Sequence, residues 1–280
     1  RARTVTTMAS PAAATKELPE LPSTPRVQLR AKLGKGEVWA VRTATIVVFA
    51  LLWEVAARRT DSILMPTFTE AMAALWEITV VTGERWPAMA TPNVALVLGY
   101  PVAVVLAVPL GLAMARWKPV DRAFGPIVAL SLALPIAPLI PVVLVAMGLG
   151  LSPRVFIIVL FSWVFIATNV RAGVRAVDQS LVEMAGSFGA TESQLWRRVL
   201  IPAALPAIMT GLRTGLGRAF AGMVIVELIM LPIGIGAHML DYRGFFQSDK
   251  LYAITIAVAV EGIVLALLMQ ALERRAQRWK

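Results

Sequence analysis

Two charged side chains, Arg218 and Glu261, stand near the middle of long apolar stretches of the sequence. A charge inside an apolar segment is costly and must be offset by an opposite charge, by water or by a bound ligand. The two residues could neutralise each other across adjacent helices, or Arg218 could face a solute pathway and attract an anion. A third interpretation is that the arginine extends along its helix to the nearest polar surface. We take both residues as candidates for a pathway.

Arg213 lies in the same stretch as Arg218, closer to its beginning. Glu227 follows Arg213 by fourteen positions, which is close to four helical turns, so the two share a helix face but lie about 21 Å apart. They cannot pair directly. We therefore expect Arg213 to organise a gate rather than to bind solute.

Prolines gather in another apolar stretch, where Ser131 is followed by Pro135, Pro138 and Pro141. Each proline frees a backbone carbonyl, which at membrane depth is tolerated only inside protein or beside a water-filled cavity. This pattern makes Ser131 and Pro135 candidates for a pathway wall. A kink that serves only helix packing is an equal alternative.

Several chemistries are missing from the sequence. It contains no cysteine and a single histidine, His238, so neither a Cys-ligated metal site nor a His cluster can form, and we expect no metal. The phosphate-binding pattern GxxxxGK[ST] is absent, since Gly34-Lys35-Gly36 lacks both the upstream glycine and the hydroxyl residue. We expect no cofactor and no enzymatic activity in this chain.

The composition indicates a membrane protein. Of the 280 residues, 58% are hydrophobic and 16% are charged, whereas soluble domains carry about a quarter charged residues. The net charge of +10 could suggest nucleic acid, but in so apolar a chain it is typical of basic loops facing the cytoplasm. We predict an all-α, multi-pass membrane protein in contact with lipid, without a nucleic-acid partner.

About twenty apolar residues cross a bilayer. Six stretches qualify as spans: 41–57, 86–115, 123–148, 152–169, 203–231 and 251–272. Residues 1–37 are rich in Pro, Ala, Thr and charge, which predicts a disordered cytoplasmic tail, or else a partner-binding arm, before a permease domain at 38–280. Thr67 and Glu70 have capping-box spacing and begin a short amphipathic helix, which lies either on the outer membrane surface or on the chain's own spans.

Charge asymmetry predicts the orientation. With six spans, both termini share one side, and the segments on that side contain nineteen Lys and Arg, Arg116 among them. The other side has six in its surface segments: Arg58, Arg59, Arg85, Arg154, Arg243 and Lys250. Since the richer side faces the cytoplasm, we expect both termini and the loop at 171–202 to be cytoplasmic.

The loop at 171–202 is longer than most connections, and such loops usually have a task. Ser180 and Glu183 have capping-box spacing and predict a helix over 181–188, ended by Gly189. Thr191 can cap a second helix with Leu195, Trp196 and Val199 on its apolar face.

This loop resembles that of the integral-membrane permeases of binding-protein-dependent ABC importers. The family pattern is Glu-Ala-Ala, three residues, Gly, nine residues and Ile-x-Leu-Pro. Here Glu183-Met184-Ala185, Gly189 and Val199-Leu200-Ile201-Pro202 keep every spacing, with only apolar exchanges at three positions. The stretches LMPTFTEAMAALWEI, LIPAALPAIMTGLRTGLGRAF and LERRAQRW are similar to the nitrate/sulfonate/taurine branch, so the resemblance covers roughly 62–280.

The resemblance implies an importer of the bacterial inner membrane. Its loop, at 183–202, would dock on a cytoplasmic dimer of ATP-binding subunits, which bind ATP and Mg²⁺, with coupling by Glu183, Ala185, Gly189 and Pro202. A second copy of the chain and an extracytoplasmic solute-binding protein are the other expected partners. The expected solute is a small organic or inorganic anion such as sulfonate, taurine or nitrate.

Two other classes remain alternatives. An ion-coupled secondary transporter should show paired internal repeats, and no convincing repeat of the fifth span occurs elsewhere. A membrane-embedded hydrolase would need paired catalytic groups at one depth, but no aspartate lies inside a predicted span.

Overall fold

The computed structural model describes residues 35–60, 62–229 and 234–276, and the expected tail at 1–37 lies almost wholly outside them. The chain divides into a unit that ends at Val48 and a unit that begins at Phe49, and every predicted site residue belongs to the second. The helices are α1 (Lys35–Thr60), α2 (Phe68–Trp76), α3 (Arg85–Arg116), α4 (Lys118–Ala133), α5 (Leu139–Met147), α6 (Leu151–Arg175), α7 (Gln179–Ser187), α8 (Glu192–Gln194), α9 (Ile201–Ile229), α10 (Ile235–Gly244) and α11 (Ser248–Ala276). Two π-helical turns, η1 (Glu77–Val81) and η2 (Leu195–Leu200), follow α2 and α8.

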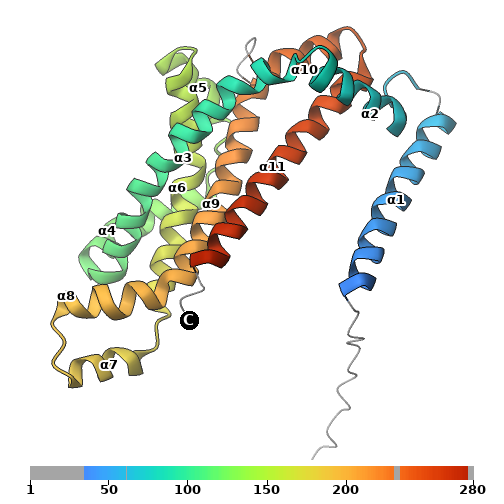
Figure 1. The fold of residues 1–280 in the computed structure, drawn as a ribbon. Coiled ribbons are helices and arrows are strands. Elements are labelled where there is room, and N and C mark those ends of the chain that lie inside the picture. Colours follow the sequence, from blue (N-terminus) through green and yellow to red (C-terminus); the bar gives the residue numbers. More distant parts are fainter. Residues whose placement is uncertain (1–34, 61, 230–233, 277–280) are drawn as a thin grey trace, which may run out of the picture. The chain divides into compact units, whose positions relative to one another are not determined.

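The bundle has two distinct ends. In Figure 1, α7 and α8 lie together at one end, here named the loop end, and α2 and α10 lie at the other, here named the opposite end. Among the described residues, five helical segments are long and apolar enough to cross a membrane: Gly36–Thr60, Arg85–Arg116, Leu151–Arg175, Glu192–Ile229 and Ser248–Arg275. The predicted all-α, multi-pass architecture is confirmed.

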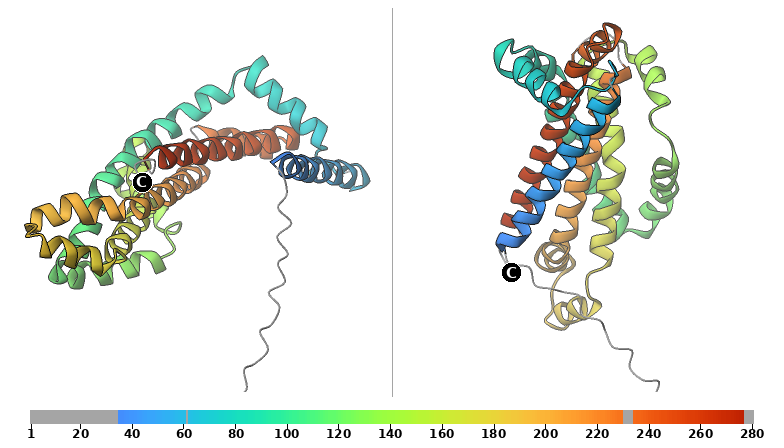
Figure 2. Two further views of the ribbon diagram at one scale, coloured as in Figure 1. Left: turned by 60° about the horizontal axis from the view of Figure 1, so that its bottom comes forward. Right: turned by 90° about the vertical axis from the view of Figure 1, so that its right-hand side faces the viewer.

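The third expected span, 123–148, is not one helix but two. Leu134 precedes Pro135 and has an extended ψ of 128°, because a proline disfavours the helical conformation of the residue before it. The chain is helical again from Leu139, directly after Pro138. Figure 2 shows α4 and α5 along one side of the bundle, and both pack on α6.

The fifth expected span begins earlier than the sequence suggested. Glu192–Ile229 is continuously helical, so the second loop helix and the span are one element, and the last expected positions, 230–231, lie outside the described residues. The π-helical turn η2 ends at Leu200, two residues before Pro202. A proline removes a donor and crowds the carbonyl four residues back, and a wider turn accommodates that defect.

Helix α2 packs on the chain's own span. The predicted capping box is present: Thr67 Oγ1 accepts from Glu70 N, and Glu70 Oε2 accepts from Thr67 N. Ala74 and Ile78, from α2 and η1, share a buried cluster with Ala253 and Ile254 of α11. Of the two alternatives for this amphipathic helix, packing on the protein is therefore the one observed.

Helices α3, α6 and α9 form the centre of the bundle, and glycines let them approach closely. A Cβ at Gly111 of α3 would lie 2.7 Å from the carbonyl oxygen of Ala167, and one at Gly215 of α9 would lie 2.4 Å from Ile166. Lipid provides no hydrophobic force between helices, so association depends on such close contacts. These positions fix how α6 lies between its neighbours.

A buried ion pair joins α6 to α9. Arg154 Nε donates to Glu227 Oε1 at 2.5 Å, both side chains are 2% exposed, and Arg154 Nη1 donates to Gly150 O at 2.9 Å. The beginning of α10 closes over the pair: a Cβ at Gly234 would meet Glu227 Oε2, and one at Gly236 would overlap the Glu227 carbonyl oxygen. The sequence had placed Arg154 among the surface charges, and the structure corrects this.

We predict that Glu227→Gln destabilises the protein by about 3–5 kcal/mol, because the buried Arg154 guanidinium loses its counter-charge. Thermal unfolding of the purified protein in detergent measures the loss. Replacing both partners, Arg154→Met with Glu227→Leu, should recover most of it, since no buried charge then remains. The control is Glu183→Gln, which changes an exposed glutamate on α7. Equal unfolding temperatures for Glu227→Gln and the control would contradict the role given to the pair.

Candidate functional site

The first loop helix, α7, begins earlier than expected. Its N-cap is Asp178, whose Oδ1 accepts from Ser180 N at 2.9 Å. That backbone hydrogen bond lowers the pKa of Asp178. Glu183 lies in the middle of the helix with its side chain exposed, so the expected cap by Ser180 and Glu183 is wrong. Glu183 is therefore available to a partner.

A tight turn separates the two loop helices. Gly189 has φ +72°, a conformation that side-chain-bearing residues resist, and no atom lies within 4 Å of the position its Cβ would take. Thr191 then caps the second helix in a capping box with Gln194. The predicted turn and the predicted second cap are both present.

One face of α7 is apolar and uncovered. Leu181, Met184 and Phe188 follow one another at three- and four-residue intervals and are exposed, Phe188 to 85%. Ala185 is half-buried, and α7 itself packs on η2. Exposed apolar side chains gathered on a short helix are typical of a protein contact surface.

The second loop helix is tied to the end of α3. Arg116 forms an ion pair with Glu192 at 2.7 Å, and its Cζ lies 5.6 Å from the ring centroid of Trp196 and 4.8 Å from that of Trp117. The guanidinium thus contacts one carboxylate and two aromatic rings. This end of the loop is held on the span before it.

Asp121, at the beginning of α4, binds the end of α6. Its carboxylate lies 2.7 Å from both Arg171 Nε and Arg175 Nη2, and Arg175 Nη2 also donates to the carbonyl oxygen of Met114 at 3.2 Å. The hydrogen bond from Arg175, and after it the hydrogen bond from Arg171, hold the pKa of Asp121 below its usual range. The residues that precede α7 are therefore held to α4 by two ion pairs.

Arg213 joins α9 to the last turns of α11. Its Nη1 lies 3.2 Å from Glu273 Oε2, and Thr210 Oγ1 donates to Glu273 Oε1 at 3.4 Å. The contact lies toward the loop end, where a gate was expected. Its role as a gate stays a prediction.

The contacts of the described residues do not pair Arg218 with Glu261. The interpretation that these two charges neutralise each other is therefore wrong. Arg218 is exposed, with its Cζ 4.4 Å from the ring centroid of Phe165 on α6. Glu261 instead lines a cavity of about 470 Å³ together with Arg85 and Asn93 of α3. The two charges occupy different faces of the bundle.

Ser131 and Pro135 lie on the side formed by α4 and α5. Ser131 Oγ donates to the carbonyl oxygen of Ile127 at 2.8 Å, so it is satisfied within its own helix. Pro135 is exposed in the break between the two helices. Their place in a pathway wall stays a prediction.

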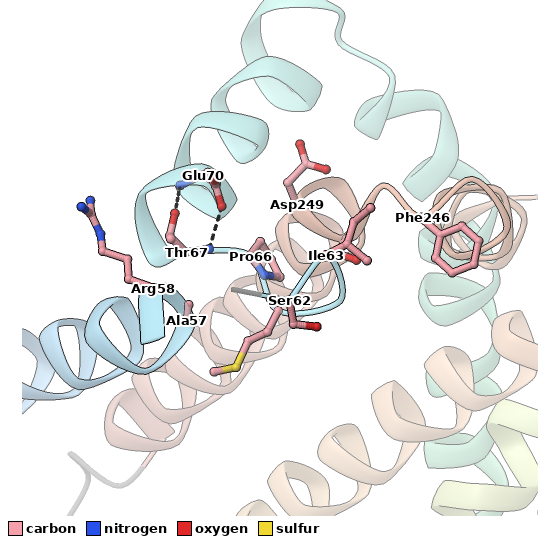
Figure 3. A pocket seen from close by; sticks show the side chains of 11 residues that line it. Ala57, Arg58, Ser62, Ile63, Pro66, Thr67, Glu70, Phe246 and Asp249 are labelled. Atoms are coloured by element: carbon pink, nitrogen blue, oxygen red, sulfur yellow. Dashed lines mark hydrogen bonds between the residues drawn. The ribbon is translucent and has the colours of Figure 1, made fainter. Parts of the chain in front are cut away.

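The opposite end carries a cavity of about 680 Å³ (Figure 3). The end of α1, the segment at 62–67 and the beginnings of α2 and α11 contribute to its lining, and Glu70 and Asp249 face it from two helices. Phe246 also lines it, with the left-handed φ of 55° that is rare for a residue with a side chain. Both Phe246 and its neighbour Phe245 are exposed.

His238 lies in the helix α10, between the last two expected spans. Tyr242 is buried, and its hydroxyl donates to Glu84 Oε2 at 3.2 Å. Burial, with the nearby Glu84 carboxylate, raises the pKa of Tyr242 to about 12. This tyrosine fixes α10 to the segment before α3.

Sequence reasoning missed Arg154, Arg116 and Trp196 as structural anchors. Arg154 and Arg116 had been counted only as surface charges, and each lies at a helix end where such a charge is ordinary. One signal was present: Glu227, inside an apolar stretch, requires a cation that the sequence alone does not identify.

Comparisons with known proteins agree with this arrangement. Residues 107–278 match the family described as "Binding-protein-dependent transport system inner membrane component". A probable ABC transporter permease of Brucella abortus is 30% identical over 65% of this chain and 73% of its own length. The taurine transport system permease protein TauC of Escherichia coli is 28% identical over 84% of this chain and 88% of its own length. The putative aliphatic sulfonates transport permease protein SsuC of the same species is 29% identical over 77% of this chain and 82% of its own length.

Among solved structures, an inward-facing MetNI methionine ABC transporter has a chain that superposes with a TM-score of 0.58. That match is 19% identical and covers 72% of this chain and 98% of the other. At this identity the likeness concerns the fold alone.

Proposed function

This chain belongs to the family of binding-protein-dependent transport system inner membrane components, and on that premise we propose that its loop helices couple solute movement to a separate ATPase. As a member it is a multi-pass permease subunit of an ABC importer and a transport component rather than an enzyme. Such importers work with an ATP-binding subunit and a binding protein. The proposal concerns how this chain engages them.

The observation that carries the coupling proposal is the uncovered apolar face of α7 beside the exposed Glu183. A partner that covered Leu181, Met184 and Phe188 would bury apolar surface, and Glu183 could pair with a cation at its edge. Since the second loop helix continues into α9, motion of α7 would reach a span directly. ATP and Mg²⁺ would be bound by that partner.

We predict that Gly189→Ala impairs coupling, because a left-handed residue with a side chain costs roughly 1–2 kcal/mol relative to glycine. Uptake by the reconstituted permease–ATPase–binding-protein complex should fall while its ATPase activity loses its dependence on loaded binding protein. Pro202, at the junction of the second loop helix and α9, would keep that junction in place.

The matched control is Gly186→Ala, the same chemical change three residues earlier. Gly186 also has open space around it but lies within α7 with an ordinary helical φ. Its alanine variant should transport like the unmodified chain. Equal uptake by both variants would count against the loop as the coupling element.

Charge distribution supports an orientation with the loop end in the cytoplasm. Near the loop end of the second unit, the described helices place nine basic residues: Arg116, Lys118, Arg122, Arg171, Arg175, Arg197, Arg198, Arg274 and Arg275. The opposite end has six, of which Arg154 is buried in its ion pair. Both termini would then be cytoplasmic.

The absence of cysteine from the sequence makes the orientation testable. A single cysteine at Ser187 on α7 should be shielded from an impermeant thiol reagent applied to intact cells, and one at Gln247 should react. Both positions are exposed, whereas Ser248 is buried and would give no signal on either side. The reverse labelling pattern would mean that the protein is inverted.

We further propose that two copies enclose the pathway, with Arg218 facing it. Thr214, Gly217 and Arg218 form an uncovered strip on α9, and no atom lies within 4 Å of a Cβ at Gly217. Each copy offers one α7, and a dimer of ATP-binding subunits would present two docking positions. A guanidinium on such a strip suits a sulfonate group, which taurine and the aliphatic sulfonates named for TauC and SsuC have in common. We therefore propose a taurine- or sulfonate-like solute.

We predict that Arg218→Gln lowers taurine uptake about tenfold, the loss expected when one charge-assisted hydrogen bond to the solute is removed. Uptake is measured in proteoliposomes containing the whole complex and saturating loaded binding protein. Arg218→Lys keeps the charge and should retain part of the rate. If Arg218→Gln transports taurine normally, Arg218 does not meet the solute.

A further inference from the structure

A second cavity lies at the loop end, between the last turns of α3 and the second loop helix. Its volume is about 700 Å³, within the range of small-molecule sites. Its apolar part comes from Pro109, Leu112 and Ala113 of α3 together with Ile201 of α9. Its polar part is formed by Arg116, Trp117, Glu192, Ser193, Trp196 and Arg197. Apolar and polar lining are thus separated along the axis of α3.

The apolar part continues a stripe along α3. Leu98, Val102 and Val105 are exposed, and Pro109 and Leu112 follow them on the same helix face at four- and three-residue intervals. Such a face on a membrane-spanning helix suits hydrocarbon. From Leu98 to Arg116 the stripe is about 27 Å long, so a long acyl chain fits along it.

The polar part lies where the span ends. Arg116 is the last residue of α3, and Trp117 follows it outside the candidate span. Tryptophan at this depth is typical of the membrane–water interface. The cavity therefore crosses the boundary between hydrocarbon and headgroups.

The charges of the cavity favour an anion. Glu192 is already paired with Arg116 at 2.7 Å. The ion pairs of the described residues leave Arg197 without a carboxylate, and its side chain is exposed. Two guanidinium groups against one carboxylate give the lining a net charge of +1.

We propose that this cavity binds an anionic phospholipid, with its phosphate at Arg197 and Arg116 and an acyl chain along the α3 stripe. The lipid would join α3 to the second loop helix, in addition to the contacts of Arg116 with Glu192 and Trp196. Lipid composition would then influence how firmly the loop is held. The binding itself requires only the chain in a membrane and does not rest on the proposed coupling to an ATPase.

The experiment measures lipid retention by the purified full-length chain. The protein is exchanged into mixed micelles containing equal amounts of phosphatidylglycerol and phosphatidylcholine, and bound lipid is counted by native mass spectrometry. Arg197→Gln should reduce the preference for phosphatidylglycerol about fivefold, the effect expected of one arginine near an anionic surface. Arg198→Gln, the same change on the adjacent exposed residue outside the cavity, should leave the preference unchanged.

Two further arms identify the source of the phosphate group. Ala113→Phe fills the apolar part, so it should reduce lipid retention if an acyl chain lies there. Inorganic phosphate at millimolar concentration should not displace the lipid. Each of four results would overturn the proposal. Two concern the variants: an equal preference for phosphatidylglycerol in Arg197→Gln and Arg198→Gln, or lipid retention unaffected by Ala113→Phe. The other two are displacement of the lipid by inorganic phosphate and a second copy of the chain covering the α3 stripe.

Discussion

The buried ion pair between Arg154 and Glu227 sets the register of α6 against α9, and the functional ends of the bundle depend on that register. In hydrocarbon, apolar side chains gain nothing by leaving lipid for protein, so helices are positioned by close backbone contacts and by polar partners. Gly215 provides a close contact near the middle of the bundle and Gly111 provides one toward the loop end. The ion pair adds the polar contact near the opposite end, where removal of either charge would leave the other unpaired.

The loop consists of two parts that are held differently. The second helix is continuous with α9 and is clasped by Arg116, whereas α7 packs on η2 and leaves its own apolar face uncovered. A force on α7 would therefore pass through the turn at Gly189 into an element that is already rigid. A loose connection at either base would absorb the displacement, and Asp121 with Arg171 and Arg175 prevents this at the first base.

Much of this arrangement could be predicted from the sequence, because it depends on local patterns. The apolar lengths of the spans, the capping residues Thr67 and Thr191 and the left-handed turn at Gly189 all follow from neighbouring residues. The neighbour that a side chain faces around its helix axis does not follow from neighbouring residues. Arg218 and Glu261 each stand near the middle of an apolar stretch, yet one lies over Phe165 and the other lines a cavity with α3, since position along a span does not determine which neighbour a side chain faces.

Helix α9 runs between the opposite end and the loop end of the bundle and is held by contacts at both. At the opposite end, Gly236 of α10 is pressed against the backbone of Glu227, and Tyr242 of the same helix is held by Glu84. At the loop end, α9 begins as the helix that Thr191 caps and Arg116 clasps. A binding event at the opposite end that shifted α10 would act on Glu227, and with it on α9, which continues as a helix into the loop. The buried pair is thus the point at which α10 meets the span that leads to the loop.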